Sequence, residues 1–383
     1  MKNIAVLTAT RAEYGLLSSL IKKLAAMDDL RVSVLVTGMH LSADFGFTYK
    51  EIEADGVPVA AKIPILADGD SAEAMSQTMA NALIKFGELF AKEKFDALVV
   101  LGDRYETLAV CCAAMNARIP IVHLHGGETT EGAVDEAIRH AITKMSYLHL
   151  TSTEAYRQRV IQLGEDPERV FCIGAPGVEN VKKVELLSRE ELFESLGIDE
   201  KENFAVMTYH PVTLEDGTVE RDMKALFNAL DQFPDLFVIA TKANADAGGR
   251  AANQLLEEYA KTHDNIIVFD SLGLRRYLSA VKYSRAVIGN SSSGIMEVPS
   301  FGVPTVNIGH RQRGRIAAES VINCATDSYS IAEAIRLALS GNVKPAANPY
   351  EKDGTSSAAA NLIRRFAVQN EIDLKKKFYD IKF

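Results

Sequence analysis

The sequence lacks several features that would assign the chain to a specialised class of protein. No apolar run approaches the ~20 residues that a membrane-spanning helix needs, so no membrane partner is expected. There is no basic tail or run of lysine and arginine, and the formal net charge is −9, which together argue against nucleic-acid binding. The N-terminal segment MKNIAVLTATRAEYG reaches charged residues soon after a short apolar run, so we expect a first strand and not a signal peptide.

Patterns typical of disulfides, zinc and dinucleotides are also missing. Four cysteines show no Cys-x-x-Cys spacing and stand in apolar surroundings, which predicts buried core thiols in a reducing cytoplasm: Cys111, Cys112, Cys172 and Cys324. No Gly-x-Gly-x-x-Gly follows the first apolar run, so an NAD enzyme is not expected. We therefore expect a cytoplasmic protein that needs no cofactor and no metal.

What the sequence does contain is a regular alternation of β-branched apolar runs and helical patterns over 383 residues. The runs predict strands at 3–10, 32–38, 62–66, 96–103, 119–127, 147–153 and 169–175, and then at 204–211, 236–243, 265–271, 285–292 and 304–309. Continuous apolar strands separated by helices are typical of parallel sheets that are covered on both faces. The sequence therefore predicts an α/β fold of two Rossmann-like domains.

A Gly/Pro-punctuated and highly charged segment, 174–203, interrupts the alternation. We place the first domain at 1–175 and the second at 176–355, with a hinge near 175–180. A C-terminal helix at about 356–383 is expected to pack back on the first domain. Ligands of such sheets bind at the carboxyl ends of the strands, so two facing domains predict a site in the cleft between them.

In the first domain, charged side chains follow two predicted strands directly. Arg11 and Glu13 come after the first strand, and Asp103 and Arg104 end a later one. Arg11, Glu13 and Arg104 are candidate substrate or nucleotide contacts. A solvated loop would also explain Arg11, and a helix N-cap would also explain Asp103.

The densest set of titratable groups lies in HLHGGETTEGAVDEAIRH. Two histidines and four acids follow one another there: His123, His125, Glu128, Glu131, Asp135 and Glu136. Asp135 alone is explained as a helix cap and dipole partner. The whole set at one edge of the sheet instead indicates acid–base chemistry. Titratable groups that lie close together raise some of one another's pKa values and lower others, as acid–base catalysis requires. A zinc site on His-x-His is an alternative, although third and fourth ligands at a recognisable spacing are missing.

In the second domain, the segment GNSSSGIMEV follows a strand with small hydroxyls at a predicted helix start. Free backbone N–H groups and the helix dipole favour phosphate there. Glu297 is expected about one turn inside that helix, where its carboxylate can accept hydrogen bonds from ribose hydroxyls. Nucleotide-binding candidates in this half are His210, Lys242, Ser291, Ser292, Ser293, Gly294, Glu297, Arg311 and Arg315, with Arg313 beside them.

Seven motifs resemble those of the hydrolysing UDP-N-acetylglucosamine 2-epimerases of sialic acid biosynthesis. They occur in the family's order over almost the whole chain: RAEY, GDRYE, HLHGGE, DEAIRHAITK, YHPVTLE, GNSSSGIMEV and GHRQRGR. The resemblance implies a GT-B type of fold, with two Rossmann-like domains facing across a cleft. It also implies anti elimination of UDP to a 2-acetamidoglucal, then hydration with inversion at C2 to give N-acetylmannosamine. A UDP-sugar substrate, a UDP product and a homodimer or homotetramer are the expected partners.

The resemblance also implies residue roles. Nucleotide contacts fall on Arg11, His210, Ser291, Ser292, Glu297 and Arg311, and the catalytic acids on Asp103 and Asp135, with Arg104 and Arg139 close by. Many relatives carry glutamate where this chain has His125. Proton transfer therefore falls to His125 or to Glu128, and the sequence leaves both open.

Four alternatives to this activity remain at this stage. A related branch that acts on UDP-N,N'-diacetylbacillosamine in legionaminic acid synthesis shares the same motifs. A GT-B glycosyltransferase would use the same nucleotide half but pass the sugar to an acceptor. A metal hydrolase built on His-x-His and a non-catalytic sugar-nucleotide sensor are less well supported by the acid-rich segment.

Overall fold

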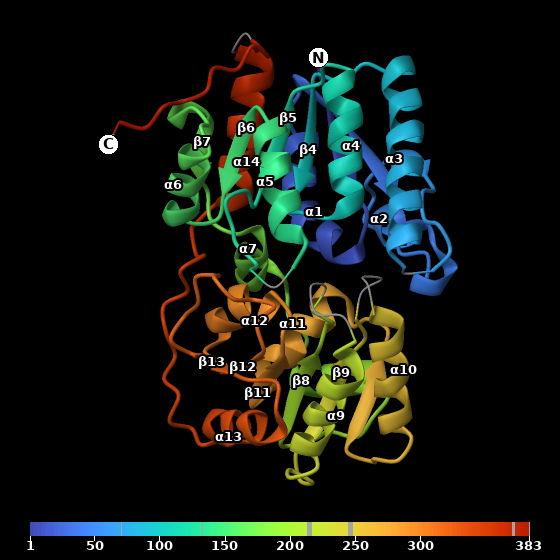
Figure 1. The fold of residues 1–383 in the computed structure, drawn as a ribbon, viewed down its shortest axis with the longest axis vertical. Coiled ribbons are helices and arrows are strands. Elements are labelled where there is room, and N and C mark those ends of the chain that lie inside the picture. Colours follow the sequence, from blue (N-terminus) through green and yellow to red (C-terminus); the bar gives the residue numbers. More distant parts are fainter. Residues whose placement is uncertain (70, 132, 213–216, 244–247, 370–371, 383) are drawn as a thin grey trace. The chain divides into compact units, whose positions relative to one another are not determined.

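A computed structural model describes residues 1–69, 71–131, 133–212, 217–243, 248–369 and 372–382 of the chain (Figure 1). The chain forms two compact units. Unit 1 comprises Met1–Glu128, Asp135–Glu179 and Tyr350–Phe383, and unit 2 comprises Thr129–Val134 and Asn180–Pro349. The boundaries between the units thus follow residues 179 and 349, whereas the predicted domain boundaries follow residues 175 and 355. The short segment Thr129–Val134 groups with unit 2, because Glu131 pairs with Arg313 through its side chain and its backbone.

Unit 1 is built on a seven-stranded parallel sheet in the order β3-β2-β1-β4-β5-β6-β7. Its strands are β1 (Lys2–Thr8), β2 (Leu30–Thr37), β3 (Val59–Ile63), β4 (Ala97–Leu101), β5 (Ile121–Leu124), β6 (Leu148–Thr151) and β7 (Val170–Cys172). Chain order reverses between β1 and β4. That pair is therefore the switch point at which open α/β sheets bind ligands.

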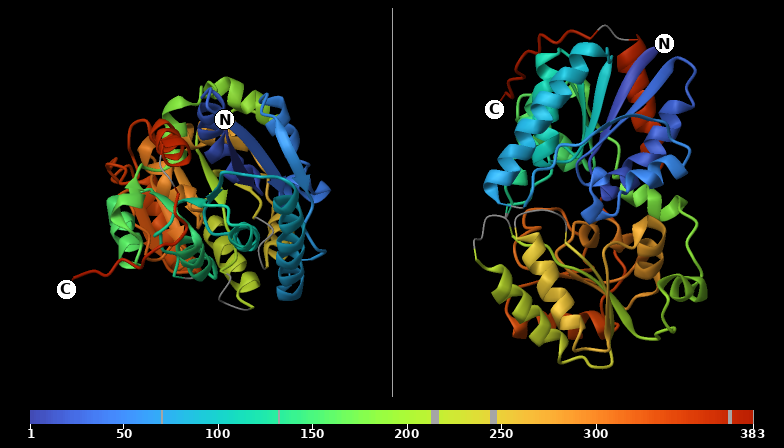
Figure 2. Two further views of the ribbon diagram at one scale, coloured as in Figure 1. Left: turned by 90° about the horizontal axis from the view of Figure 1, so that it is seen from above. Right: turned by 90° about the vertical axis from the view of Figure 1, so that its right-hand side faces the viewer.

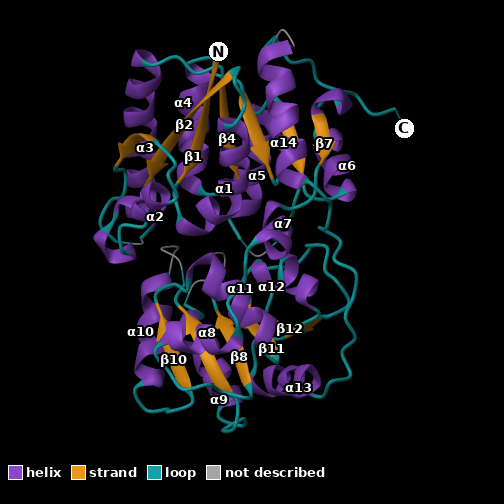
Figure 3. Cartoon of the chain, turned by 180° about the vertical axis from the view of Figure 1, so that it is seen from behind, coloured by secondary structure: helices purple, strands orange, loops and turns teal. Residues whose placement is uncertain are grey.

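Helices cover both faces of this sheet (Figures 1 and 3). They are α1 (Arg11–Ala25), α2 (Tyr49–Ala54), α3 (Ala72–Lys92), α4 (Tyr105–Asn116), α5 (Asp135–Met145), α6 (Glu154–Gln162), α14 (Thr355–Arg364) and, at the boundary between the units, α7 (Pro176–Lys183). Alternate residues of β1 enter different cores. Ile4 and Val6 pack with α1 and α14, whereas Ala5 and Leu7 pack with α3 and α4. This two-sided burial explains the continuous apolar runs of the sequence.

Unit 2 repeats the plan with a six-stranded parallel sheet in the order β10-β9-β8-β11-β12-β13 (Figure 2). Its strands are β8 (Phe204–Thr208), β9 (Phe237–Thr241), β10 (Ile266–Phe269), β11 (Ala286–Gly289), β12 (Thr305–Ile308) and β13 (Val321–Cys324). Its helices are α8 (Arg189–Leu196), α9 (Val219–Leu230), α10 (Gly249–Ala260), α11 (Gly273–Tyr283), α12 (Ser293–Met296) and α13 (Ser328–Leu339). The switch point of this sheet lies between β8 and β11.

Every predicted run overlaps an observed strand, but β13 was not predicted. It is a four-residue edge strand without a fully buried residue, so it carries no continuous apolar signal. Most of the observed strands are also shorter than the runs. The last residues of several runs turn away from the sheet and carry the side chains described below.

The predicted C-terminal helix to 383 is wrong in its extent. Helix α14 ends at Arg364, a π-helical turn follows at Arg365–Gln369, and residues 372–382 form neither helix nor strand. Lys376 and Tyr379 of this last segment donate hydrogen bonds to other parts of unit 1. The helix itself packs on α1 in the core of unit 1.

All four cysteines are free, but only Cys111 is buried as predicted. Cys112 lies next to it on α4 and points from a different side of the helix. Cys172 and Cys324 end the edge strands β7 and β13, which leaves them half-exposed.

Candidate active site

Several of the predicted residues lie at the carboxyl ends of the strands that form the two switch points. In unit 1 these are Arg11 and Glu13 after β1, and Asp103 and Arg104 after β4. In unit 2 they are His210 after β8 and the serines after β11. The fold thus places both sets where open α/β sheets bind their ligands.

Glu13 shapes the turn between β1 and α1. Its Oε2 accepts hydrogen bonds from the backbone N–H groups of Ala9 (2.7 Å) and Thr10 (3.1 Å), while its own N–H donates to the Thr10 hydroxyl (3.2 Å). These contacts form a capping box. Burial raises the pKa of Glu13 to about 7, although the charge of Arg104 opposes the shift. The carboxylate that the sequence analysis assigned to a ligand therefore holds the first turn of α1.

Arg11 keeps part of its guanidinium available. Nη2 lies 2.8 Å from Oε1 of Glu51, and the side chain is 27% exposed. Its Nε is buried and finds no hydrogen-bond partner among the described residues. A buried donor without an acceptor is costly, so a ligand anion at this strand end would satisfy it.

Arg139 is the centre of a charged cluster in unit 1. This side chain of α5 is 1% exposed, and its Nη2 donates to the carboxylate of Asp103. Nη1 donates to Oε2 of Glu136 (2.8 Å) and to the backbone carbonyl of Glu128 (3.0 Å). Asp103 does not cap α4, because the N-cap of α4 is Arg104 and makes no side-chain cap bond. The carboxylate of Asp103 thus joins the start of α4 to α5.

Asp135 begins α5, as predicted, one helical turn before Arg139. Residues four apart share a face of a helix, so Asp135 and Arg139 lie on the same side of α5. The predicted crowd of acids is smaller than the sequence suggested, because Glu131 belongs to unit 2 and pairs with Arg313 there.

His125 and Glu128 form a buried pair. Nδ1 of His125 lies 2.6 Å from Oε1 of Glu128, and the Ser152 hydroxyl donates to the same oxygen at 2.7 Å. His125 has a φ of 65°, in the left-handed region, which is uncommon for a residue other than glycine. Its Nε2 is buried and has no partner in the described part of the chain. Glu128 therefore orients the imidazole so that Nε2 is the nitrogen left for chemistry.

His123 has a structural role. Its Nε2 lies 2.7 Å from the Gly102 carbonyl, its Nδ1 lies 3.3 Å from the Thr143 hydroxyl, and the residue is fully buried. Burial lowers the pKa of His123 to about 3, so the ring is neutral at neutral pH. Both nitrogens are engaged, which leaves none for the His-x-His zinc alternative. Among the described residues, no three ligating side chains are grouped to hold a metal.

Glu106 and Ser152 were not predicted from the sequence. Nε of Arg104 donates to Oε1 of Glu106 at 2.5 Å, and Glu106 is 1% exposed. An acid in the first turn of the otherwise apolar helix α4 was the available signal for it. Ser152 gave no signal, because a serine after a strand is common in loops.

Asn290 organises the switch point of unit 2. Its Oδ1 accepts from the N–H of His210 and its Nδ2 donates to the carbonyl of His210, both at 2.7 Å. Its own carbonyl accepts from Arg311 Nη1 (3.1 Å) and from Gln312 Nε2 (2.8 Å). Asn290 was also missed, although it lies inside the quoted serine motif. It ties together the ends of β8 and β11 and the segment after β12.

The serine segment differs from the predicted helix start. Helix α12 has only four residues, and Glu297 stands at its C-terminal end rather than one turn inside a helix. Pro299 follows in a 3-10 turn and stops the helix. The Ser293 hydroxyl accepts from the Tyr277 hydroxyl at 2.9 Å, so Ser291 and Ser292 are the better candidates for phosphate contact. At Gly294 a Cβ would lie 2.7 Å from Cγ2 of Thr305, so this glycine serves packing.

Lys242 has the weakest basis among the predicted nucleotide residues. Its Nζ lies 2.5 Å from a carboxylate oxygen of Asp270 and 2.5 Å from one of Glu257. Hydrogen bonds to these two acids raise the pKa of Lys242. Because two carboxylates share its ammonium, Lys242 is not among the nucleotide contacts that we propose.

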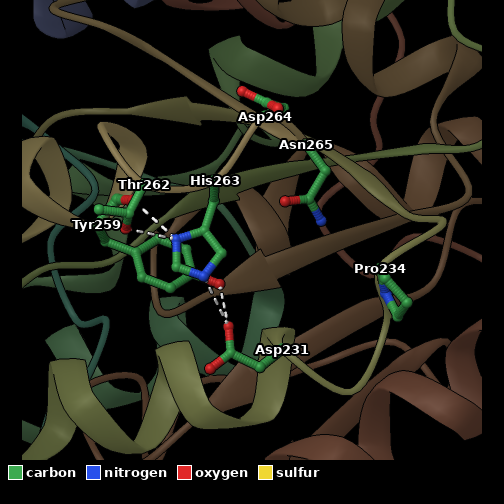
Figure 4. A pocket seen from close by; sticks show the side chains of 7 residues that line it. All are labelled: Asp231, Pro234, Tyr259, Thr262, His263, Asp264 and Asn265. Atoms are coloured by element: carbon green, nitrogen blue, oxygen red, sulfur yellow. Dashed lines mark hydrogen bonds and ion pairs between the residues drawn. The ribbon is translucent and has the colours of Figure 1, made fainter.

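Two of the hollows in the described part of the chain lie on unit 2. One, of about 190 Å³, is lined among others by Asn307, Gln312 and Arg315, whose Nη1 lies 3.2 Å from Sδ of Met296. The other, of about 430 Å³, lies just before β10 and includes the Tyr259 ring stacked on His263 at 3.9 Å (Figure 4). None of the predicted residues lines the larger hollow, which lies at the amino edge of the sheet.

Comparison with known proteins assigns the chain to a family. Residues 22–364 match the UDP-N-acetylglucosamine 2-epimerase family. The chain belongs to this family. It is 42% identical over 323 residues, 84% of each chain, to GDP/UDP-N,N'-diacetylbacillosamine 2-epimerase (hydrolyzing) of Campylobacter jejuni. It is 38% identical over 386 residues to polysialic acid biosynthesis protein P7 of Escherichia coli, covering 100% of this chain and 98% of that protein.

Solved structures show the same fold. UDP-GlcNAc 2-epimerase from Neisseria meningitidis, bound to UDP-GlcNAc, superposes with a TM-score of 0.80 at 16% identity, covering 95% of this chain and 100% of that one. The predicted α/β fold with two Rossmann-like, GT-B-like sheets is confirmed. As a member of this family, the protein is an enzyme that acts on a sugar nucleotide. No helix in the described ranges has the length and apolar character needed to cross a bilayer.

Proposed function

We propose that this enzyme is a hydrolysing UDP-sugar 2-epimerase that releases UDP and a 2-epimerised sugar. The observation that carries the proposal is the buried His125–Glu128 pair beside the Asp103–Arg139 cluster at one strand edge of unit 1. A glycosyl transfer needs one base, whereas elimination followed by hydration needs several groups that move protons. The hydrolysing relative from Campylobacter jejuni supports the release of free sugar.

The nucleotide is held by the switch point of unit 2. Arg311 and the backbone N–H groups at Ser291 and Ser292 bind the diphosphate, because charge-assisted bonds to phosphate are strong. His210, held by Asn290, completes this contact. Glu297 accepts bonds from the ribose hydroxyls. Arg11 and Arg315 supply further positive charge, in a chain whose formal net charge is −9.

The first chemical step is elimination. The C1–O bond breaks and its electrons leave with UDP, while the electrons of the C2–H bond form the C1–C2 double bond. The C2 hydrogen is not adjacent to a carbonyl, so departure of UDP runs ahead of proton removal and the ring gains positive charge. Carboxylates near the ring, Asp103 and Asp135, stabilise that charge.

Proton transfer at C2 falls to His125 in this proposal. Glu128 holds Nδ1, so Nε2 takes the proton during elimination. Hydration then adds the water oxygen to C1 and a proton to C2 from the opposite face. The product is a mannosamine-type sugar with inverted C2.

Isotopes test the reaction directly. In D₂O the product should carry deuterium at C2, and in H₂¹⁸O the label should enter at C1. A product that keeps its original hydrogen at C2 would mean simple hydrolysis or glycosyl transfer. Release of UDP only when an acceptor is added would favour the glycosyltransferase.

Two sugars are candidates for the substrate. N-acetylglucosamine agrees with the family, whereas the 42% identical relative favours N,N'-diacetylbacillosamine. Incubation with each UDP-sugar, followed by NMR of the product, decides between them. The preferred substrate is the one with the higher kcat/KM.

A further inference from the structure

A second buried charge cluster lies in unit 1, away from the residues assigned to the reaction. Glu165 is 1% exposed and accepts bonds from Lys144 Nζ (2.6 Å), His149 Nε2 (3.0 Å) and Lys376 Nζ (2.7 Å). Burial opposes its charged form, but the bonds from His149, Lys144 and Lys376 outweigh it and lower the pKa of Glu165 to about 2. Three elements meet at this carboxylate: the end of α5, β6 and the C-terminal segment.

Lys376 satisfies all three N–H groups of its ammonium. Besides Glu165, it donates to the carbonyls of Lys144 (2.9 Å) and Ser146 (2.5 Å). The last carbonyls of a helix lack partners within the helix and carry partial negative charge. Lys376 therefore caps the C-terminal end of α5 from a distant part of the chain.

The segment 372–382 is held at a second point. The N–H of Tyr379 donates to the Gly164 carbonyl at 2.9 Å. Gly164 has a φ of 87°, and a Cβ there would collide with the ring of Phe378. The Lys144 ammonium lies 4.9 Å from the centre of that ring. These contacts give Lys376 one defined place under α5.

Helix α5 connects this cluster to the proposed chemistry. It carries Asp135 and Arg139 and ends where Lys376 binds. The Thr143 hydroxyl donates to the Arg139 carbonyl at 3.0 Å and lies 3.3 Å from Nδ1 of His123. A displacement of the helix end therefore shifts Arg139 against Asp103.

We propose that Lys376 is a positioning residue: by binding Glu165 and the last carbonyls of α5, it sets the place of the helix that carries Asp135 and Arg139. The assignment rests on the proposed function, which gives these two residues their part in the reaction. Lys376 itself touches no reacting atom.

The test compares Lys376→Met with Lys377→Met and Lys376→Arg in the full chain. Methionine keeps the apolar stem and removes the ammonium, Lys377 is an exposed neighbour, and arginine restores the charge. Three experiments are done below the unfolding transition of each variant: steady-state kinetics of UDP release for kcat and KM, calorimetry for UDP affinity, and hydrogen exchange of the α5 amides.

We expect Lys376→Met to lower kcat roughly 10- to 100-fold, as small misplacements of reacting groups do. UDP affinity should stay unchanged, and α5 should exchange faster. Lys376→Arg should recover part of kcat, and Lys377→Met should match the wild type. A wild-type kcat or unaltered α5 exchange in Lys376→Met would overturn the positioning role.

Failure of the proposed function would look different. A wild-type protein that turns over neither UDP-sugar would remove the proposed function and the positioning role with it. An active wild type beside an equally active Lys376→Met would overturn the positioning role alone.

Discussion

His210 and Asn290 are joined by two reciprocal hydrogen bonds at the switch point of unit 2. The side-chain amide of Asn290 accepts from the N–H and donates to the carbonyl of His210, both at 2.7 Å, across 80 residues of sequence. The backbone of His210 is thereby fixed without involving its imidazole. His210 is one of the residues in the nucleotide contact we propose.

Asn290→Ala should weaken UDP binding about tenfold or more, because His210 and the Arg311 segment lose their common support. Asn253 is a matched control, since its side chain binds the N–H (2.7 Å) and the carbonyl (3.1 Å) of Ala243 in the same reciprocal way. Asn253→Ala should lose comparable stability but keep UDP affinity. Calorimetric titration with UDP separates the two. Equal affinity in both variants would argue against a nucleotide site at this switch point.

His125→Ala should slow turnover by at least ~10²-fold and leave UDP affinity unchanged, because a positioned general base contributes about that much. Glu128→Gln should slow turnover less, since Glu128 orients His125 rather than taking the proton. In the double variant the two losses should not multiply, as residues that act through one another are not additive. A full multiplication of the two losses would give Glu128 its own proton-transfer role.

Asp103→Asn and Asp135→Asn should each slow turnover by at least ~10²-fold while UDP affinity stays nearly unchanged. An acid that serves only hydration should release UDP and accumulate the 2-acetamidoglucal. NMR of the reaction mixture detects that intermediate and assigns the step. Turnover at the wild-type rate in both variants would remove these carboxylates from the mechanism.

Arg139→Met should lower the free energy of unfolding by about 3–5 kcal/mol, because it leaves the Asp103 and Glu136 carboxylates without their buried partner. Arg313→Met breaks an ion pair with Glu131 in which the arginine side chain is 66% exposed. That loss should be below about 1 kcal/mol. Urea unfolding followed by circular dichroism compares the variants. Equal losses of unfolding free energy in Arg139→Met and Arg313→Met would mean that the Arg139 cluster is solvated.

The pKa of Glu13, raised to about 7 by burial, predicts a pH effect on stability. Protonated Glu13 is favoured in the folded state, so its contribution is fully present below the unfolded pKa of 4.5 and is lost as the pH rises through about 7. Glu13→Gln keeps a capping side chain and removes this dependence. The variant should therefore gain stability relative to the wild type between pH 4.5 and 8.

Thermal unfolding over this pH range measures the effect. The exposed Glu191 in the capping box of α8 is the control, because its pKa is lowered by its bonds to Ser188. Glu191→Gln should show no such gain above pH 5. A constant difference between Glu13→Gln and the wild type across the range would mean that Glu13 stays charged in the folded state.

The sequence by itself determined every strand of the two parallel sheets except β13, and many of the side chains at the strand ends. Continuous apolar runs and helical periods are local signals, and the carboxyl ends of parallel strands share one edge. The motifs also indicated the family to which the chain belongs. For this reason Asp103, His125, Glu128 and Arg139 could be named before any pairing was known.

Only the tertiary structure decided which groups meet and what burial does to them. Arg139 reaches Asp103 across 36 residues, and Lys376 reaches Glu165 across 211. Such pairs leave no periodic trace in the sequence. The proposal that His125 rather than Glu128 takes the proton likewise rests on the 2.6 Å contact between Nδ1 of His125 and Glu128. Long-range hydrogen bonds and desolvation depend on where the whole chain packs, and local patterning does not encode that.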